Sequence, residues 1–67
     1  MRNPSSVYAT VLGEFVREVR TDRHLSVRAL AALAPGCSHA TIVRLENGKP
    51  VNFAHLVSVL RALGFSL

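Results

Sequence analysis

The stretch from Ser38 to Lys49, SHATIVRLENGK, contains both the start and the stop of one short helix. Ser38 is an N-cap residue, because its hydroxyl can accept a hydrogen bond from an unpaired backbone N–H of the first turn. Gly48 follows the last turn, and glycine readily adopts the left-handed conformation that ends many helices. Ile42 and Leu45 lie three residues apart and share one face. The stretch therefore predicts a helix that packs one face on a core supplied by the rest of the chain.

The opposite face of this helix is polar and carries no acidic residue. A helix that presents small polar groups, an imidazole and a guanidinium is suited to the major groove of DNA. The plainer alternative is an ordinary solvated helix face. The residues concerned are Ser38, His39, Ala40, Thr41 and Arg44.

The charge balance favours a polyanionic partner. The 67 residues include eight Lys and Arg against four Asp and Glu, which gives a net charge of +4. Seven of the eight cations are Arg, and a guanidinium binds phosphate or guanine in a two-pronged geometry that an ammonium cannot match. A GC-rich genome would raise the arginine content as well, so the charge alone does not decide the function.

Composition also argues against several other classes of protein. Cys37 is the single cysteine, so the chain can form neither an internal disulfide nor a thiolate zinc site, as expected in a reducing cytosol. His24 and His55 have no carboxylate or thiol at ligand spacing, and we expect no metal and no cofactor.

The sequence shows neither a pair of acids nor a nucleophile with a neighbouring base, the arrangements typical of enzymes. It also lacks a signal-peptide core and a membrane span of ~18 apolar residues, so we expect a cytoplasmic protein without membrane contact.

The periodicity of the remaining chain predicts three further helices. Residues 1–6 are expected to form a flexible N-terminal arm, because Pro4 and two serines discourage a helix, and residues 7–67 are expected to form one domain. The first helix is predicted over residues 7–20. The second begins after Ser26 and ends at Pro35 and Gly36, because proline cannot continue a helix. The fourth begins after Asn52 and ends at Gly64, and residues 65–67 are expected to be extended.

Each predicted helix has an apolar face expected to point toward the core. Gly13 interrupts the first helix at a cost of roughly 1 kcal/mol relative to alanine, which suggests that it permits a close contact. The predicted class is a compact all-α domain of four helices. Tyr8 is expected in the core or at the rim of the first helix. The other residues expected to face the core are Val11, Leu12, Phe15, Val16 and Val19 in the first helix, Leu30, Ala31, Leu33 and Ala34 in the second, and Phe53, Leu56, Val57, Leu60 and Leu63 in the fourth.

Two helices joined by a short turn that contains glycine form a helix-turn-helix arrangement. A series of short motifs runs through and around these two helices: Leu25-Ser26, Leu30-Ala31, Gly36-Cys37-Ser38, Thr41-Ile42, Arg44-Leu45-Glu46-Asn47-Gly48-Lys49, Leu56-Val57, Leu60 and Ala62-Leu63-Gly64. With these motifs the chain resembles the Cro/C1-type (XRE) helix-turn-helix family over roughly residues 11–65. This resemblance implies a lambda-repressor-like fold and a sequence-specific DNA-binding transcriptional repressor.

Within that family, residues 56–67 following Asn47-Gly48-Lys49 resemble the HipB-like antitoxins. This implies a small homodimer that represses its own operon and holds a HipA-like kinase toxin. Two alternatives stay open. One is a stand-alone repressor of the phage or restriction-controller type. The other is a protein-binding module that neutralises a partner without specific DNA binding.

The family motif also implies roles for individual residues. The base-reading positions correspond to Ser38, His39, Ala40 and Arg44, and a structural ion pair corresponds to Arg20 and Glu46. The chain departs from the pattern at Val27, where the family often has glutamine, and in a turn at Ala34–Cys37 that is one residue longer than usual. The candidates for phosphate contacts, which fix register rather than sequence preference, are Ser26, Arg28, Thr41, Asn47 and Lys49.

Four apolar residues near the C-terminus do not all fit the inward face of the fourth helix. Small proteins rarely expose such residues, so we expect a homodimer interface, with residues 65–67 pairing with their mate as a short strand. The alternative is that they belong to the core of one subunit. A dimer would place two recognition helices ~34 Å apart on double-stranded DNA and would bind a palindromic operator. The interface candidates are Val51, Val59, Phe65 and Leu67.

Overall fold

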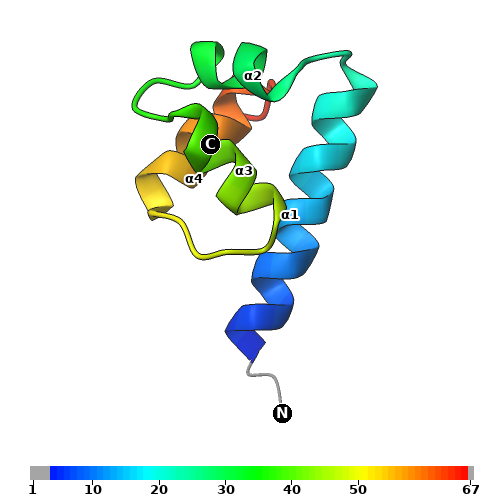
Figure 1. Ribbon diagram of the computed structural model, residues 1–67, viewed down its shortest axis with the longest axis vertical. Helices are drawn as coiled ribbons and strands as arrows, with labels where there is room; N and C mark the ends of the chain where they lie inside the picture. The colour runs from blue at the N-terminus through cyan, green and yellow to red at the C-terminus, as the bar shows by residue number, and fades with distance from the viewer. Residues whose placement is uncertain (1–3, 67) are drawn as a thin grey trace.

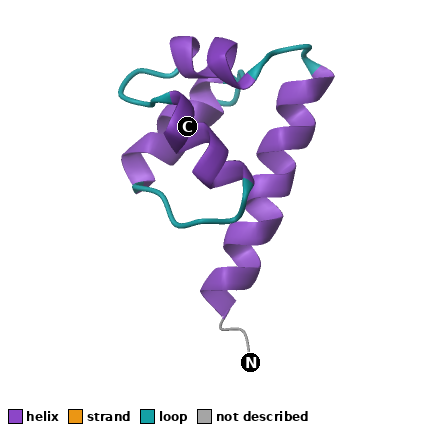
Figure 2. Ribbon diagram, in the orientation of Figure 1, coloured by secondary structure: helices purple, strands orange, loops and turns teal. Residues whose placement is uncertain are grey.

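A computed structural model describes residues 4–66 and contains four helices in this range. They are α1 (Pro4–Asp22), α2 (Val27–Leu33), α3 (His39–Glu46) and α4 (Phe53–Ala62), arranged as Figure 1 shows. Within residues 4–66 there is no strand (Figure 2), and no helix there is long and apolar enough to cross a membrane. The predicted all-α class with four helices is confirmed.

The first helix is longer than the sequence predicted. It begins at Pro4 instead of Val7 and ends at Asp22 instead of Arg20. Proline is well tolerated at the first helical position, because its missing N–H would have no partner there anyway. Residues 1–3 of the expected arm lie outside the described residues. With 19 residues, α1 is about 28 Å long, and its N-terminal end projects beyond the other three helices (Figure 1).

The core is built from all four helices. Ile42 and Leu45 of α3 are both buried, as predicted from their spacing. Around them pack partly buried apolar residues that include Leu12, Val19 and Leu56. Among the residues whose burial the structure describes, the buried apolar ones are Val16, Leu30, Ala34, Ile42, Leu45, Val59 and Leu63.

Several apolar residues that the sequence analysis placed in the core are exposed instead. Tyr8 and Val11 of α1 are 73% and 59% exposed, Phe53 at the start of α4 is 76% exposed, and Phe15 and Leu33 are also exposed. Those predictions were wrong. The helical period shows which residues share a face, but the width of the covered face depends on the neighbouring helices.

The expected C-terminal interface is also partly wrong. Val59 is completely buried in the core of one chain, so it cannot contribute to a dimer surface. Val51 is partly buried against the same core. Phe65 stays exposed, and its ring lies 5.6 Å from the ring of Phe15 between centroids. Leu67 lies outside the described residues.

Gly13 brings α1 into direct contact with the C-terminal end of α3. A Cβ atom at this position would collide with the carbonyl oxygen of Leu45 and would lie 3.1 Å from the carbonyl oxygen of Glu46. The absence of a side chain therefore permits the two helix backbones to approach each other. This contact is the reason for a glycine in the middle of a helix, where it otherwise costs stability.

Three of the helices end in the same type of cap, in which a residue with positive φ follows the last turn. That residue is Gly48 after α3, with φ 75°, and Gly64 after α4, with φ 98°. After α1 it is His24, with φ 57°. The two hydrogen bonds of the motif are present there, from His24 N–H to the Thr21 carbonyl (3.0 Å) and from Leu25 N–H to the Arg20 carbonyl (3.1 Å).

The contact at Gly13 predicts that Gly13→Ala destabilises the domain. We expect a loss of about 1–3 kcal/mol, because overpacking against backbone atoms outweighs the better helix propensity of alanine. Urea denaturation followed by circular dichroism measures the change. Glu14→Ala, at an exposed position of the same helix, should change the stability by less than about 0.5 kcal/mol. A Gly13→Ala variant as stable as the wild type would contradict the close contact.

The left-handed backbone at His24 predicts that His24→Gly stabilises the domain. We expect a gain of about 0.5–1 kcal/mol, because glycine removes the steric cost of positive φ while adding some entropy to the unfolded chain. Thermal unfolding should show a melting temperature higher by several degrees. Gly64→Ala, the reverse change at the equivalent position of α4, should lower it. A melting temperature that falls with His24→Gly would show that the imidazole makes a stabilising contact.

Candidate nucleic-acid interface

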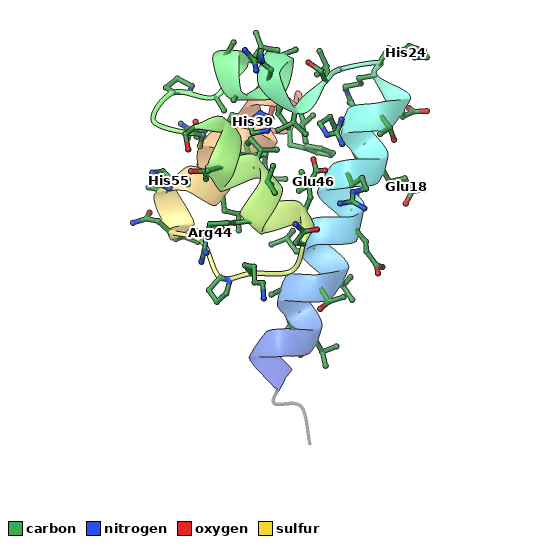
Figure 3. The ribbon with its side chains drawn as sticks, viewed as in Figure 1. Glu18, His24, His39, Arg44, Glu46 and His55 are labelled. Atoms are coloured by element: carbon green, nitrogen blue, oxygen red, sulfur yellow. The ribbon has the colours of Figure 1, made fainter. Side chains whose placement is uncertain are left out.

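The residues proposed to read DNA bases are all exposed at α3. Ser38, His39, Ala40 and Arg44 are accessible, whereas Ile42 and Leu45 face the core. In Figure 3, His39 lies at the start of α3, Arg44 lies on the side away from α1, and Glu46 is turned toward α1. Ser38, His39 and Ala40 thus form the exposed start of the helix, and Arg44 extends from its later part.

The first turn of α3 is closed by two hydroxyl groups. The Ser38 Oγ accepts a hydrogen bond from the Thr41 backbone N–H at 3.2 Å and lies 3.1 Å from the Thr41 Oγ1. Each hydroxyl has one donor hydrogen, so the contact between them uses one and leaves the other for a ligand. The capping pair therefore orders the start of the helix and keeps one donor available.

Arg44 is held along the loop that follows α3. Its Nη2 donates to the carbonyl oxygen of Pro50 at 3.2 Å. A guanidinium has five N–H donors in a planar fork, so this bond leaves donors for an acceptor outside the chain. The contact orients the exposed side chain.

The candidates for phosphate contacts come from α2 and α3 and from the residues that follow α3. Ser26 caps α2, with its Oγ accepting from the Ala29 N–H at 2.9 Å, and Arg28 is exposed in the first turn of that helix. Asn47 and Lys49 are exposed after the last turn of α3. All four residues are therefore accessible to a partner.

Glu46 is the buried acid of this region, and it faces α1. Its side chain is 3% exposed and accepts from Arg20 Nε at 2.6 Å and from Arg20 Nη2 at 2.9 Å. Arg20 also donates from Nη1 to the carbonyl oxygen of Leu25 at 2.8 Å. The hydrogen bond to Glu46 raises the pKa of Arg20 above its ordinary value, while burial acts in the opposite direction. This two-pronged contact ties α3 to the C-terminal half of α1.

A second arginine, Arg17, joins the pair and was missed by the sequence analysis. Its Nε lies 3.3 Å from the Glu46 Oε1, and its Nη2 donates to the Asn47 Oδ1 at 3.4 Å. Arg17 is one helical turn before Arg20, so the i, i+3 spacing of two arginines was the available signal. The Arg17 side chain is 56% exposed, against 13% for Arg20.

The unusually long turn between α2 and α3 is held by α4. The Ser58 Oγ donates to the Pro35 carbonyl oxygen at 2.8 Å, and the Cys37 Sγ lies 3.5 Å from the His55 carbonyl oxygen. Gly36 has φ 81° and accommodates the sharp bend. Val27, at the position where glutamine was expected from the family pattern, packs against the core. Both departures from the pattern thus have structural partners within the chain, and Ser58 is a supporting residue that the sequence did not single out.

A family model described as a helix-turn-helix domain matches residues 11–67 of the chain. The match covers α2, α3, α4 and the larger part of α1. No curated protein and no solved structure gives a significant match.

The geometry around Glu46 predicts unequal effects for its two arginine partners. Arg20→Ala should cost about 3 kcal/mol or more, because it leaves a buried carboxylate without its main partner. Arg17→Ala should cost less than about 1 kcal/mol, because that contact is exposed to solvent. Urea denaturation of both variants measures the difference. Equal losses would contradict the assignment of Arg20 as the main partner.

Proposed function

The chain belongs to the helix-turn-helix domain family, of the Cro/C1/XRE type, and from this we propose that it is a sequence-specific DNA-binding transcriptional repressor. The observation that supports the proposal most directly is the exposed surface of α3. Ser38, His39, Ala40 and Arg44 are all accessible there, and the acid of this helix, Glu46, is held in an ion pair with Arg20. We expect no enzymatic activity and, for a regulator of transcription, a place in the cytoplasm with the chromosome.

In this proposal the exposed side of α3 enters the major groove. Arg44 forms a two-pronged contact with guanine, a ring nitrogen of His39 donates to guanine, and the methyl group of Ala40 packs on a thymine methyl. The hydroxyl hydrogen left over by Ser38 and Thr41 is available to a base or a phosphate. In helix-turn-helix proteins the N-terminal residues of the recognition helix contact base edges; here these are Ser38, His39 and Ala40, and the longer side chain of Arg44 adds a contact from the following turn.

The phosphate contacts fix the register of the helix on the duplex. We assign them to the start of α2, to the first turn of α3 and to the end of α3, where polar groups and cations are exposed. The burial of Glu46 supports this assignment, because a free carboxylate so close to Asn47 and Lys49 would repel phosphate. The residues in this role are Ser26, Arg28, Thr41, Asn47 and Lys49.

We further propose that the protein binds a palindromic operator as a homodimer, with two α3 helices about one DNA turn apart. A small domain of this kind contacts few base pairs, and a second copy doubles the contacts. A chain of 67 residues also buries a small core and gains stability from association.

The finer proposal is that the repressor is the autoregulating antitoxin of a HipA-like kinase toxin. It is supported by the resemblance of residues 56–67 to HipB-like antitoxins. If so, a kinase encoded beside this chain should co-purify with it and lose its activity in the complex. If the chain represses its own promoter without any such partner, it is a stand-alone repressor of the phage or restriction-controller type.

A second candidate function, a protein-binding module without specific DNA binding, is favoured by a groove between α2 and α4. The groove has a volume of about 650 Å³ and is lined mainly by apolar side chains. Leu33 and Phe53, which border it, are both exposed. Such a groove could hold an apolar segment of a partner protein.

A titration against the DNA upstream of its own gene separates the two functions. The protein is titrated at two salt concentrations, with a scrambled duplex as the control. The repressor should prefer the native sequence, and its affinity should fall with salt by a slope of about −0.9 for each neutralised phosphate. Weak binding without preference would overturn the repressor and favour the protein-binding module.

The different roles of Arg44 and Lys49 predict different effects of their removal. Arg44→Ala should cost about 1–3 kcal/mol of operator affinity and relax the preference at one base pair. Lys49→Ala should weaken binding to all sequences alike and reduce the salt slope by about one. Binding assays on the operator and on single-base variants measure both effects. If Arg44→Ala weakens binding equally on every duplex, Arg44 contacts phosphate instead of a base.

A further inference from the structure

One apolar surface of the chain has no role in the structure described so far. Val7, Tyr8, Val11 and Phe15 of α1 are all exposed, and their spacing places them along a single side of the helix. We call these four residues the α1 stripe. None of them belongs to the core or to the apolar residues packed against it. Phe65 adjoins the stripe through its ring contact with Phe15.

The stripe lies on the side of α1 that faces away from the rest of the domain. The stripe begins in the half of α1 that projects beyond the other helices (Figure 1). The opposite side of the same helix, with Gly13 and Val16, faces the rest of the domain. A projecting helix end gains little from its own hydrogen bonds and depends on packing for stability.

We propose that the α1 stripe is a two-fold interface with the same stripe of a second copy, in which the two α1 helices run antiparallel and cross at Val11. In an antiparallel pair, residues equally far from the crossing point on either side face each other. Val7 and Phe15 both lie four residues from Val11, so each Val7 meets Phe15 of the second copy. Val11 meets its own mate, and an apolar contact then runs along the whole stripe.

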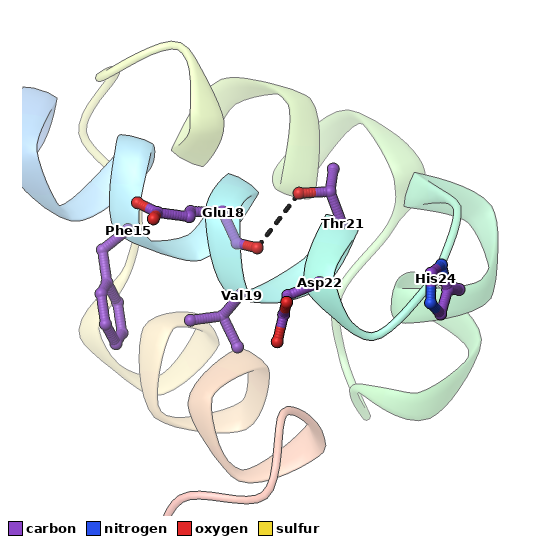
Figure 4. A pocket seen from close by; sticks show the side chains of 6 residues that line it. All are labelled: Phe15, Glu18, Val19, Thr21, Asp22 and His24. Atoms are coloured by element: carbon purple, nitrogen blue, oxygen red, sulfur yellow. Dashed lines mark hydrogen bonds between the residues drawn. The ribbon is translucent and has the colours of Figure 1, made fainter.

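The charge along α1 favours the antiparallel orientation over the parallel one. Beyond Phe15 the same side of the helix continues with two exposed acids, Glu18 and Asp22. In Figure 4, Phe15, Val19 and Asp22 leave α1 on one side. An antiparallel pair places the acidic end of each helix beside the N-terminal end of the other, which carries partial positive charge. A parallel pair would bring like charges together.

This interface differs from the pairing of residues 65–67 that the sequence suggested, although Phe65 lies at its edge. It does not depend on the DNA-binding function, because a dimer can form whether or not α3 reads bases. A DNA titration that shows no specific binding would therefore not contradict the interface. Absence of a dimer through the α1 stripe would not contradict DNA binding by the single domain.

Disulfide crosslinking tests the contact and its register. In a Cys37→Ser background, Val11→Cys should form a covalent dimer within minutes of mild oxidation, because each cysteine faces its mate. Ala32→Cys, exposed on α2 and outside the stripe, is the control and should crosslink at least tenfold more slowly. Val7→Cys mixed with Phe15→Cys should form the mixed dimer faster than either forms its own. Equal rates for Val11→Cys and Ala32→Cys would overturn the proposal.

Sedimentation of the otherwise unmodified chain supplies the second test. Val11→Glu places two like charges at the crossing point and should raise the dimer dissociation constant at least tenfold. The helical content should stay unchanged, because residue 11 is exposed in the single chain. Two outcomes would overturn the proposal: a wild-type chain that is monomeric at millimolar concentration, or a dimer that survives Val11→Glu and is lost when Phe65 is replaced by serine.

Discussion

The position of α3 depends on its contact with α1 at Gly13 and Glu46. At Gly13 the backbones of the two helices meet without an intervening side chain. At Glu46 the side chain reaches across to Arg20 and Arg17 of the same helix. Both contacts involve the C-terminal half of α3. That half is therefore fixed to the domain, while the N-terminal half, with His39 and Ala40, is left exposed.

The buried ion pair also shapes the electrostatics of the proposed interface. A carboxylate taken from water into a protein is costly unless charged donors satisfy it, and here Arg20 supplies two donors with a third from Arg17. The negative charge is neutralised inside the domain, so the cations Arg44 and Lys49 dominate the nearby surface. Glu46 thus holds α3 on α1, and because its charge is neutralised there, it does not repel a polyanion at the nearby surface.

Features that depend on local sequence were predictable, and features that depend on packing were less so. Ser38 caps α3 as predicted, and Ser26 and Asn52 cap the helices that were expected to begin after them, because a cap is formed between residues close in sequence. Val59 and Phe53 were assigned to the wrong environments, because an apolar residue looks the same whether it meets a core or solvent. The exposure of the site residues of α3 was predictable from their polar or small side chains, but the hydrogen bond from Arg44 to Pro50 required the fold of the loop.

The α1 stripe is a second case in which the sequence predicted the apolar pattern but not what the apolar residues contact. Its residues have the spacing of a core-facing helix, and the sequence analysis placed Tyr8, Val11 and Phe15 with Val16 on that basis. The pattern is correct for a helix with two covered sides, one facing its own domain and one free to face another chain. A single sequence does not distinguish these two sides, because burial by a second copy and burial by the same chain select the same residue types.

The caps at both ends of α3 reduce the free energy that a binding partner would have to supply to order this helix. A helix of two turns frays readily when its ends are free. Ser38 at one end and Gly48 at the other supply hydrogen-bond partners to both ends of α3. The helix is then already in its final shape before any contact forms, so association does not spend part of its free energy on ordering this segment. Variants that remove the Ser38 hydroxyl would weaken binding through lost pre-organisation even where the hydroxyl itself touches nothing on the ligand.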